Sequence, residues 1–401
     1  MPNIVYQKAL ELLHQAAAPQ GFLASVQPIT NYNRVWARDG VICGLAALTS
    51  GDEQLIQTFR STLETLALHQ HETGTIPSNV AFGAAGTSEV SYGGLAGRVD
   101  AVTWFIIGVT QYTYVTGDTS FYQKMEPAVH KALALLQNWE FNNRHLMYVP
   151  LSGNWADEYI TDGYVLYDQL LRIWALRGVQ YCAPTASNAA KIEAIEAQVL
   201  FNFTRNSGQE HYHERAYQEV TWNRYMPCSF NPAGYKNRFD AFANALSLLL
   251  NLGTPTFQAT QMEYMMELAG QQPLGLVPAF WPPVFPGEED WQLLKNNCKY
   301  EFRNHPHEFH NGGSWPMVNG FCGIALVQRG KVTEAVQLRE QLDDANALED
   351  FAFYENFNTQ TMAPNGVPQC TWSAAGSVML YTYLYSQKPL LFEFESWNQK
   401  P

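Results

Sequence analysis

Residues 126–140 read EPAVHKALALLQNWE, and this stretch indicates the kind of structure that the chain favours. Val129, Ala132 and Leu136 recur at spacings of three and four residues, which places them on one face of a helix. Pro127 suits the first turn of a helix, where its missing N–H group is not needed. The stretch therefore predicts an amphipathic helix that begins near Pro127 and buries its apolar face.

The same helical period recurs along the chain. Comparable faces are formed by Val5, Ala9, Leu12, Leu13 and Ala16, by Phe59, Leu63 and Leu66, and by Ile192, Ile195 and Val199. Alternation with a period of two is scarce, and HLMYVPL at 145–151 is the best candidate for a short strand. Because no linker or low-complexity segment divides the sequence, we expect an all-α fold in a single domain over residues 1–401.

Composition limits the classes of ligand and compartment. The chain is 46% hydrophobic and carries a net charge of -13, which supports a large core and disfavours nucleic acid as a partner. No signal peptide is evident, and apolar runs such as ALSLLL are far shorter than the roughly 20 residues of a membrane span. The six cysteines are scattered, as in reducing compartments. We expect a cytoplasmic protein without a membrane partner, and the composition leaves a homo-oligomer open.

Long loops rich in glycine, proline and aromatic residues are expected between the helices. They cover 71–98, 150–163, 222–238, 279–315 and 354–372. Seven tryptophans lie in or beside them: Trp36, Trp155, Trp222, Trp281, Trp291, Trp315 and Trp372. Aromatic faces stack on the C–H faces of sugar rings, while polar side chains bind the hydroxyl groups. The loops therefore indicate a small-molecule carbohydrate site.

Hydrolysis of a glycosidic bond needs two carboxyl groups that reach one pocket. The candidates are Asp39, Asp100, Asp157, Glu158, Asp162, Asp240 and Glu355. Arg38 directly precedes Asp39, and Arg238 lies two residues before Asp240, so we expect these two acids to stay ionised and to bind sugar. Asp157 and Glu355 have no adjacent cation and are flanked by aromatic residues, so burial is expected to raise their pKa, as acid catalysis requires.

The motif HPHEFHNGG at 305–313 contains three histidines, but their spacing matches no strong zinc pattern. We expect no metal and no cofactor, and His310 is expected to bind sugar or to support the loop. The sequence also contains no P-loop, no G-x-G-x-x-G after a strand and no G-x-S-x-G motif. Phosphoryl transfer, dinucleotide chemistry and serine hydrolysis are therefore disfavoured.

Four ordered segments resemble the plant and cyanobacterial alkaline/neutral invertases. HNGGSWP, which begins at position 310 and precedes an amphipathic helix, is similar to the same heptapeptide segment of that family. NYNRVWARDG at 31–40, GRVDAVTW at 97–104 and the segment at 353–376, which ends in TWSAAG, resemble three further family segments in the same order. The combination is specific because the four segments span most of the chain.

The resemblance implies an (α/α)6 barrel, in which six inner and six outer helices place long loops at one end. It also implies an inverting glycoside hydrolase in which Asp157 is the general acid and Glu355 the general base. The residues that we expect to bind the substrate are Tyr32, Trp36, Arg38, Asp39, Asp100, Trp155, Glu158, Gln169, Arg238, Asp240, His310, Gly312, Trp315 and Trp372.

The chain departs from the invertases directly after Asp157, where Glu158 and Tyr159 replace two arginines. TWSAAG and NRFDAFANALSLLL, at 237–250, also resemble debranching-type and trehalase-like α-glucosidases. The leading hypothesis is an exo-acting hydrolase of the terminal α-glucosidic bond of a small sugar, either sucrose or another short α-glucoside. The alternatives are a debranching-type α-1,6-glucosidase, a sugar epimerase or isomerase that uses histidines, and a non-catalytic sugar-binding protein.

Overall fold

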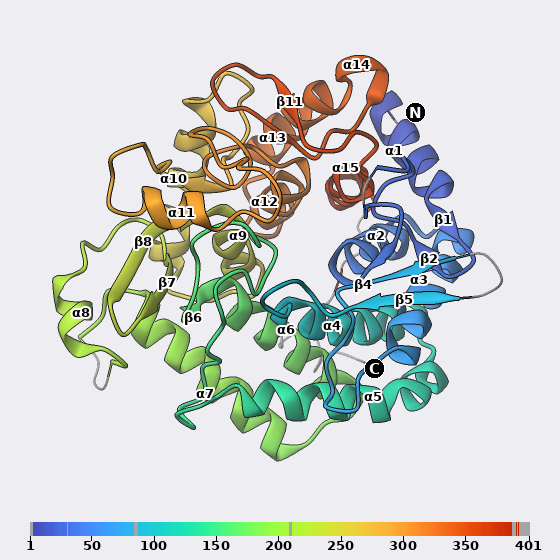
Figure 1. Cartoon of the computed structure of the whole chain (residues 1–401), viewed down its shortest axis with the longest axis horizontal. Helices are drawn as coiled ribbons and strands as arrows, with labels where there is room; N and C mark the ends of the chain where they lie inside the picture. The colour runs from blue at the N-terminus through green and yellow to red at the C-terminus, as the bar shows by residue number, and fades with distance from the viewer. Residues whose placement is uncertain are drawn as a thin grey trace.

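The computed structural model describes residues 3–29, 31–83, 87–207, 211–386, 390 and 392. Helices dominate this part of the chain (Figure 1). They are α1 (Ile4–Gln15), α2 (Ala37–Ser50), α3 (Glu53–Leu68), α4 (Val99–Thr116), α5 (Thr119–Asn138), α6 (Leu166–Cys182), α7 (Ala186–Phe203), α8 (Glu214–Glu219), α9 (Ala241–Leu249), α10 (Pro255–Gly270), α11 (Trp291–Asn296), α12 (Pro316–Gln328), α13 (Val332–Asn346), α14 (Leu348–Phe351) and α15 (Thr371–Tyr385).

Six of these helices form a closed ring at the centre of the molecule (Figure 1). Along the ring, α2 contacts α4, α4 contacts α6, α6 contacts α9, α9 contacts α12, α12 contacts α15, and α15 returns to α2. The ring helices are buried on nearly every side, and α4 is buried without a break from Val99 to Thr113. A helix that is apolar all round belongs in the core of a large domain.

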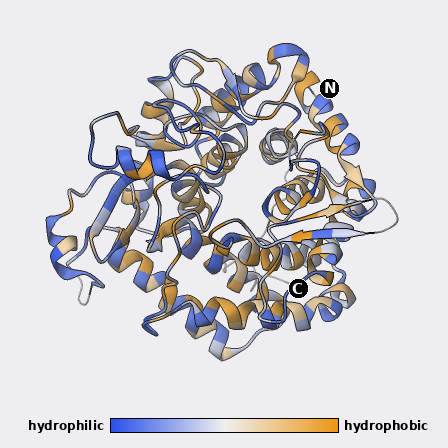
Figure 2. Cartoon of the chain, in the orientation of Figure 1, coloured by the Kyte–Doolittle hydropathy of each residue, from blue (hydrophilic) through white to orange (hydrophobic). Residues whose placement is uncertain are grey.

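The outer helices alternate with the inner ones along the chain. Each packs mainly against one ring helix: α1 on α15, α3 on α2, α5 on α4, α7 on α6, α10 on α9 and α13 on α12. Figure 2 shows hydrophilic and hydrophobic residues alternating on outer helices such as α5 and α7, because only one face of each meets the ring. The architecture is of the α/α-barrel type, which confirms the helical character that the sequence predicts.

The helix around residues 126–140 is present but begins earlier than expected. α5 starts at Thr119, and the side chain of Asp118 caps it by accepting a hydrogen bond from the Phe121 N–H at 3.0 Å. Pro127 lies inside the helix. The start predicted at Pro127 is therefore wrong, because the capping aspartate satisfies an N–H group at the true N-terminus.

The strands are short and lie in the segments that connect the helices. They are β1 (Ala17–Ala18), β2 (Gly21–Phe22), β3 (Val35–Trp36), β4 (Asn79–Phe82), β5 (Ser88–Ser91), β6 (Tyr164–Val165), β7 (Pro227–Asn231), β8 (Gly234–Asp240), β9 (Phe280–Trp281), β10 (Asn356–Phe357) and β11 (Pro364–Asn365). All pairings are antiparallel, in the orders β1-β2, β3-β4-β5, β6-β7-β8-β9 and β10-β11.

The strand predicted at 145–151 does not form. Within it only Val149 pairs, in an isolated bridge to Gly163. The longer strands β7 and β8 lie in the segment that the sequence marked as a loop. β3 leads directly into α2, β6 into α6 and β8 into α9, so these sheets lie at the end of the ring where the inner helices begin.

The first and last described helices meet at one seam of the ring. α1 packs against α15, and Ser25 forms a bridge to Cys370. The Thr371 hydroxyl donates hydrogen bonds to the carbonyl oxygens of Leu23 at 2.8 Å and Ala24 at 3.0 Å. Contacts between the first and last helical pairs therefore close the ring. Among the described helices, none combines the length and apolar character that crossing a membrane requires.

Candidate active site

A pocket of about 540 Å³ lies where the inner helices begin. Its walls are supplied by the residues before α2, before α6, before α12 and before or at the start of α15. The residues that line it are Asn31, Tyr32, Arg34, Trp36, Arg38, Asp39, Trp155, Asp157, Glu158, Lys299, Tyr300, Glu301, Arg303, Phe309, His310, Trp315, Glu355 and Trp372. The sequence alone brought eleven of these together as candidates, from segments far apart in the chain.

Aromatic side chains form the inner surface of the pocket. The Trp315 ring lies edge-on to Trp155 at 5.6 Å and to Trp372 at 5.7 Å, measured between ring centroids. His310 stacks on Trp315 at 4.8 Å, and burial lowers its pKa well below the usual value. A neutral imidazole offers one donor and one acceptor, which suits contact with a sugar hydroxyl.

Asp157 enters the pocket from the loop before β6. The preceding Asn154 fixes this loop, because its side chain accepts a hydrogen bond from the Ala156 N–H at 3.1 Å. The Arg98 guanidinium donates to Oδ2 of Asp157 at 2.7 Å and also binds the Ser152 carbonyl oxygen. Asp157 has no cation next to it in the sequence, but folding brings Arg98 beside it from 59 positions away.

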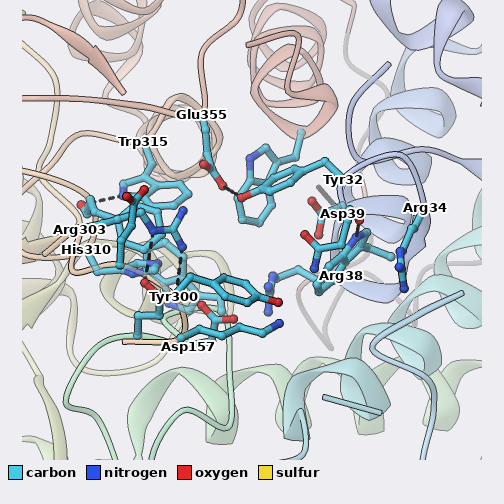
Figure 3. Close-up of a pocket in the computed structure, with 18 residues that line it drawn as sticks. Tyr32, Arg34, Arg38, Asp39, Asp157, Tyr300, Arg303, His310, Trp315 and Glu355 are labelled. Carbon is cyan, nitrogen blue, oxygen red and sulfur yellow. Dashed lines mark hydrogen bonds and ion pairs between the residues drawn. The ribbon is translucent and has the colours of Figure 1, made fainter. Parts of the chain in front are cut away.

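Glu355 lies at the opposite side of the pocket from Asp157 (Figure 3). Its side chain is only 3% exposed, and burial raises its pKa to about 7. The Tyr32 hydroxyl donates a hydrogen bond to Oε1 at 2.7 Å, and the Arg303 guanidinium is also near; both oppose the rise. Glu355 therefore has the raised pKa that its aromatic flanks predict, despite a cation that the sequence did not reveal.

Arg303 is the main pocket residue that sequence reasoning missed. It forms an ion pair with the buried Glu158 at 3.1 Å and lies 4.1 Å from the centre of the Phe309 ring. Burial raises the pKa of Glu158, and Arg303 opposes this rise. Tyr159, the other departure from the invertase pattern, points into the core and stacks on Phe280 at 4.2 Å. The departure thus replaces arginine with a Glu158–Arg303 pair in the pocket.

The neighbours of Arg303 also line the pocket, as do Asn31, Arg34 and Phe309. The relevant stretch, Lys299, Tyr300, Glu301 and Arg303, lies in the long loop 279–315. The length of this loop and its charged residues could have indicated a binding role for the stretch, but the stretch matched no motif. Tyr300 is 84% exposed, and Figure 3 shows its side chain close to Asp157.

Arg38 and Asp39 begin α2 and lie at the edge of the pocket. Arg38 binds Asp100 rather than Asp39, with 2.6 Å between Nη1 and Oδ2. Asp100 is 1% exposed and does not line the pocket. Burial raises the pKa of Asp39 to about 6 although Arg38 opposes this. The adjacent arginine therefore only partly offsets the effect of burial on the pKa of Asp39.

Asp240 and Arg238 also lie outside the described pocket. Asp240 caps α9 by accepting a hydrogen bond from the Ala243 N–H at 3.0 Å, and burial raises its pKa to about 7. Arg238 turns away to Asp290 at 3.1 Å. The predicted Arg238–Asp240 pairing is wrong, because Arg238 pairs with Asp290 and the Asp240 carboxylate faces the first turn of α9.

Two further residues that we expected to bind the substrate contact loop segments instead. The Gln169 amide holds both the N–H and the carbonyl oxygen of Met147 at 2.9 Å. Gly312 has φ +94°, and a Cβ atom there would lie 2.7 Å from Pro283 Cγ. Neither residue lines the pocket.

The remaining loop tryptophans and histidines lie elsewhere. Trp222 packs against Tyr235, Trp291 packs against Phe302, and Trp281 packs against His307. His305 and His307 do not line the pocket, so His310 is its single histidine among the described residues. The part of the chain that the structure describes contains no group of three or more metal-ligating side chains.

Known proteins match the chain over most of its length. The sequence model of the family described as alkaline and neutral invertase matches residues 6–213 and 220–387. Alkaline/neutral invertase E, chloroplastic, of Arabidopsis thaliana is 22% identical, over 93% of this chain and 70% of its own length. Cytosolic invertase 1 of Oryza sativa subsp. japonica is 22% identical, over 79% and 65%.

A solved structure shares the fold. The mannosylglycerate hydrolase from Thermus thermophilus, in complex with glucose, superposes with a TM-score of 0.66 at 13% sequence identity. The match covers 94% of this chain and 99% of that one, so the two proteins share the fold over nearly their whole lengths. Together with the family match, which spans more than half of the sequence, these findings show that the chain belongs to the alkaline and neutral invertase family of glycoside hydrolases.

Proposed function

We propose that this protein is an inverting, exo-acting glycoside hydrolase that cleaves the terminal α-glucosidic bond of a small sugar. The observation that carries the proposal is the arrangement of two carboxyl groups. Asp157 and Glu355 come from separate loops and lie at opposite sides of one aromatic pocket (Figure 3). An inverting hydrolase needs an acid on one face of the sugar and a base on the other.

The proposal assigns the chain to a single domain with an (α/α)6 barrel. The closed cycle of six inner helices and the outer helix against each of them support this assignment. The non-reducing sugar would lie against Trp315 and Trp36, with Arg38 and Asp39 binding its hydroxyl groups. The inner helices begin at this pocket, so the positive ends of their dipoles face the carboxylates.

Asp157 donates its proton to the glycosidic oxygen as the bond from that oxygen to the anomeric carbon breaks. Arg98 holds Oδ2 of Asp157, which leaves Oδ1 to face the leaving oxygen. Glu355 removes a proton from water while the water oxygen bonds to the anomeric carbon from the opposite face. The products are a β-configured sugar and a free alcohol. Solvent then exchanges protons with both carboxyl groups and restores the starting state.

Sucrose and other short α-glucosides remain the substrates to compare. The Glu158–Arg303 pair lies beside Asp157, where the leaving group would depart. It presents both a carboxylate and a guanidinium to hydroxyl groups of the leaving sugar, whereas the invertase pattern presents arginines. We therefore place the choice of leaving group at this pair.

The test is hydrolysis of a panel of sucrose, trehalose, maltose, isomaltose, glucosylglycerol, glucosylglycerate and short branched dextrins, followed by NMR of the released anomer. We expect initial release of the β-anomer from an α-glucoside. Asp157→Asn and Glu355→Gln should each abolish it. Initial release of the α-anomer, or full activity of either variant, would contradict the assignment.

A further inference from the structure

The carboxylate of Glu355 is held from two sides by residues distant in the sequence. On one side, the Tyr32 hydroxyl donates to Oε1 at 2.7 Å, across 323 positions of sequence. On the other side, the Val367 N–H donates to Oε2 at 3.4 Å. These contacts fix both oxygens, so the carboxylate has a defined orientation relative to the pocket.

The backbone of Gly366, which carries no side chain, lies against the same carboxylate. Its φ is +76°, and a Cβ atom built on it would lie 2.2 Å from Oε2 of Glu355. Gly366 and Val367 also line a second cavity of about 470 Å³, which shares Tyr32 and Arg303 with the first pocket. Only glycine therefore fits at position 366 without displacing the Glu355 carboxylate.

We propose that Tyr32 and Gly366 are positioning residues, which hold the Glu355 carboxylate in the orientation in which it removes a proton from water. The inference rests on the proposed role of Glu355 as the base. It assigns Tyr32 a different task from binding sugar, and it gives Gly366 a task that no motif indicated. A base held by fixed donors needs no reorientation during the reaction.

The hydrogen bond from Tyr32 also sets the pH range in which the base is ionised. The groups that face Glu355 are the Tyr32 hydroxyl, the Arg303 guanidinium, the Asp39 carboxyl and the Cys370 thiol. Burial raises the pKa of Glu355 to about 7, and the Tyr32 hydrogen bond opposes this because it stabilises the ionised form. Removing the bond must raise the pKa further.

Tyr32→Phe is the first variant. The base must be ionised, so kcat/KM falls as the pH drops through its pKa. We expect this acid limb to move upward by about one pH unit, the size of one charged hydrogen bond. We expect kcat at neutral pH to fall by about tenfold or more, with KM within about twofold of the parent.

Tyr354→Phe is the matched control. Its hydroxyl also donates to a glutamate, Glu349, at 2.6 Å, but it lies outside both cavities. Its removal should change neither the acid limb nor kcat. If Tyr32→Phe raises KM and leaves kcat and the acid limb unchanged, Tyr32 is a sugar contact and the inference fails.

Gly366→Ala tests the second residue, with Gly330→Ala as its control. Gly330 has φ +78°, almost the same as Gly366, but a Cβ atom there meets nothing within 4 Å. Both variants bear a similar backbone strain at a positive φ, and Gly366→Ala adds the close contact with Glu355, so its melting temperature should fall at least as far as that of Gly330→Ala. We expect Gly366→Ala alone to lose about 100-fold in kcat. Equal kcat values for the two variants would overturn the role of Gly366.

Glu355→Gln distinguishes a failure of the proposed function from a failure of the positioning roles of Tyr32 and Gly366. If Glu355→Gln retains activity, the proposed function is wrong. If it is inactive while Tyr32→Phe and Gly366→Ala behave like their controls, the function stands and the positioning inference is wrong.

Discussion

Replacing Glu355 by glutamine is expected to make the protein more stable above neutral pH. The carboxyl is 3% exposed, and burial raises its pKa from an ordinary 4.5 to about 7. A neutral amide of the same shape can still accept the Tyr32 hydrogen bond without carrying a buried charge. The residue that we propose as the base therefore reduces stability at the pH where it works.

The size of the gain follows from the shift in pKa. The difference is about 2.5 pH units, and each unit corresponds to about 1.4 kcal/mol, so ionised Glu355 costs about 3 kcal/mol. Below pH 4.5 the carboxyl is protonated in both folded and unfolded chains, and no cost arises. The cost grows as the pH rises through 4.5 to 7 and is complete above 7. For 401 residues it corresponds to roughly 4 °C in melting temperature.

The assay is thermal unfolding of Glu355→Gln and the parent at pH 8.5 and at pH 4. We expect a gain of about 4 °C at pH 8.5 and none at pH 4. Glu301→Gln, at an exposed glutamate on the pocket mouth, should show little difference at either pH. An equal gain at both pH values, or no gain at pH 8.5, would refute the electrostatic reasoning.

Three further outcomes follow from the geometry. Asp157→Asn should lose hydrolysis of ordinary glycosides. It should keep a rate within about tenfold of the parent on α-glucosyl fluoride, measured with a fluoride electrode, because fluoride leaves without a proton. Equal losses on both kinds of substrate would contradict the proposed role of Asp157 as the acid. Gly320→Ala should lower the free energy of unfolding by about 1–3 kcal/mol in urea, because its Cβ would lie 2.6 Å from the Gly376 Cα between α12 and α15; an unchanged midpoint would show that the helices move apart freely. Arg303→Met should cost about 2 kcal/mol by leaving the buried Glu158 unpaired, and Glu158→Gln in the same chain should restore part of it; additive losses in a double-mutant cycle would count against that pair.

The helical faces were predictable because helical periodicity is local. The predicted face of α7 is an example, since Ile192, Ile195 and Val199 are all buried. Boundaries depended on finer chemistry: Pro127 suggested a helix start, although the cap at Asp118 provides it. The β7–β8 hairpin was missed because its residues lack a clean alternation of apolar and polar side chains.

For the candidate site, the sequence placed the carboxylates and aromatic residues on loops but did not reveal their neighbours. Arg98 precedes Asp157 by 59 positions and Arg303 follows Glu158 by 145, so neither pairing leaves a local pattern. For Arg38, adjacency in the sequence suggested a pair with Asp39, but in the structure its guanidinium binds Asp100. Pairings of this kind form only when the ring brings distant segments together, so no short stretch of sequence contains both partners.

The seam between the segments around α1 and α15 has a consequence for synthesis. Tyr32 follows the first strands and Glu355 precedes the last helix, and the contacts of Thr371 with Leu23 and Ala24 bring these segments together. A nascent chain that still lacks α15 has both proposed catalytic residues, but it lacks the Thr371 contacts that hold the segments of Tyr32 and Glu355 together. We expect such a chain to be inert towards sugars until its last helix leaves the ribosome, so that enzymatic activity itself reports completion of the fold.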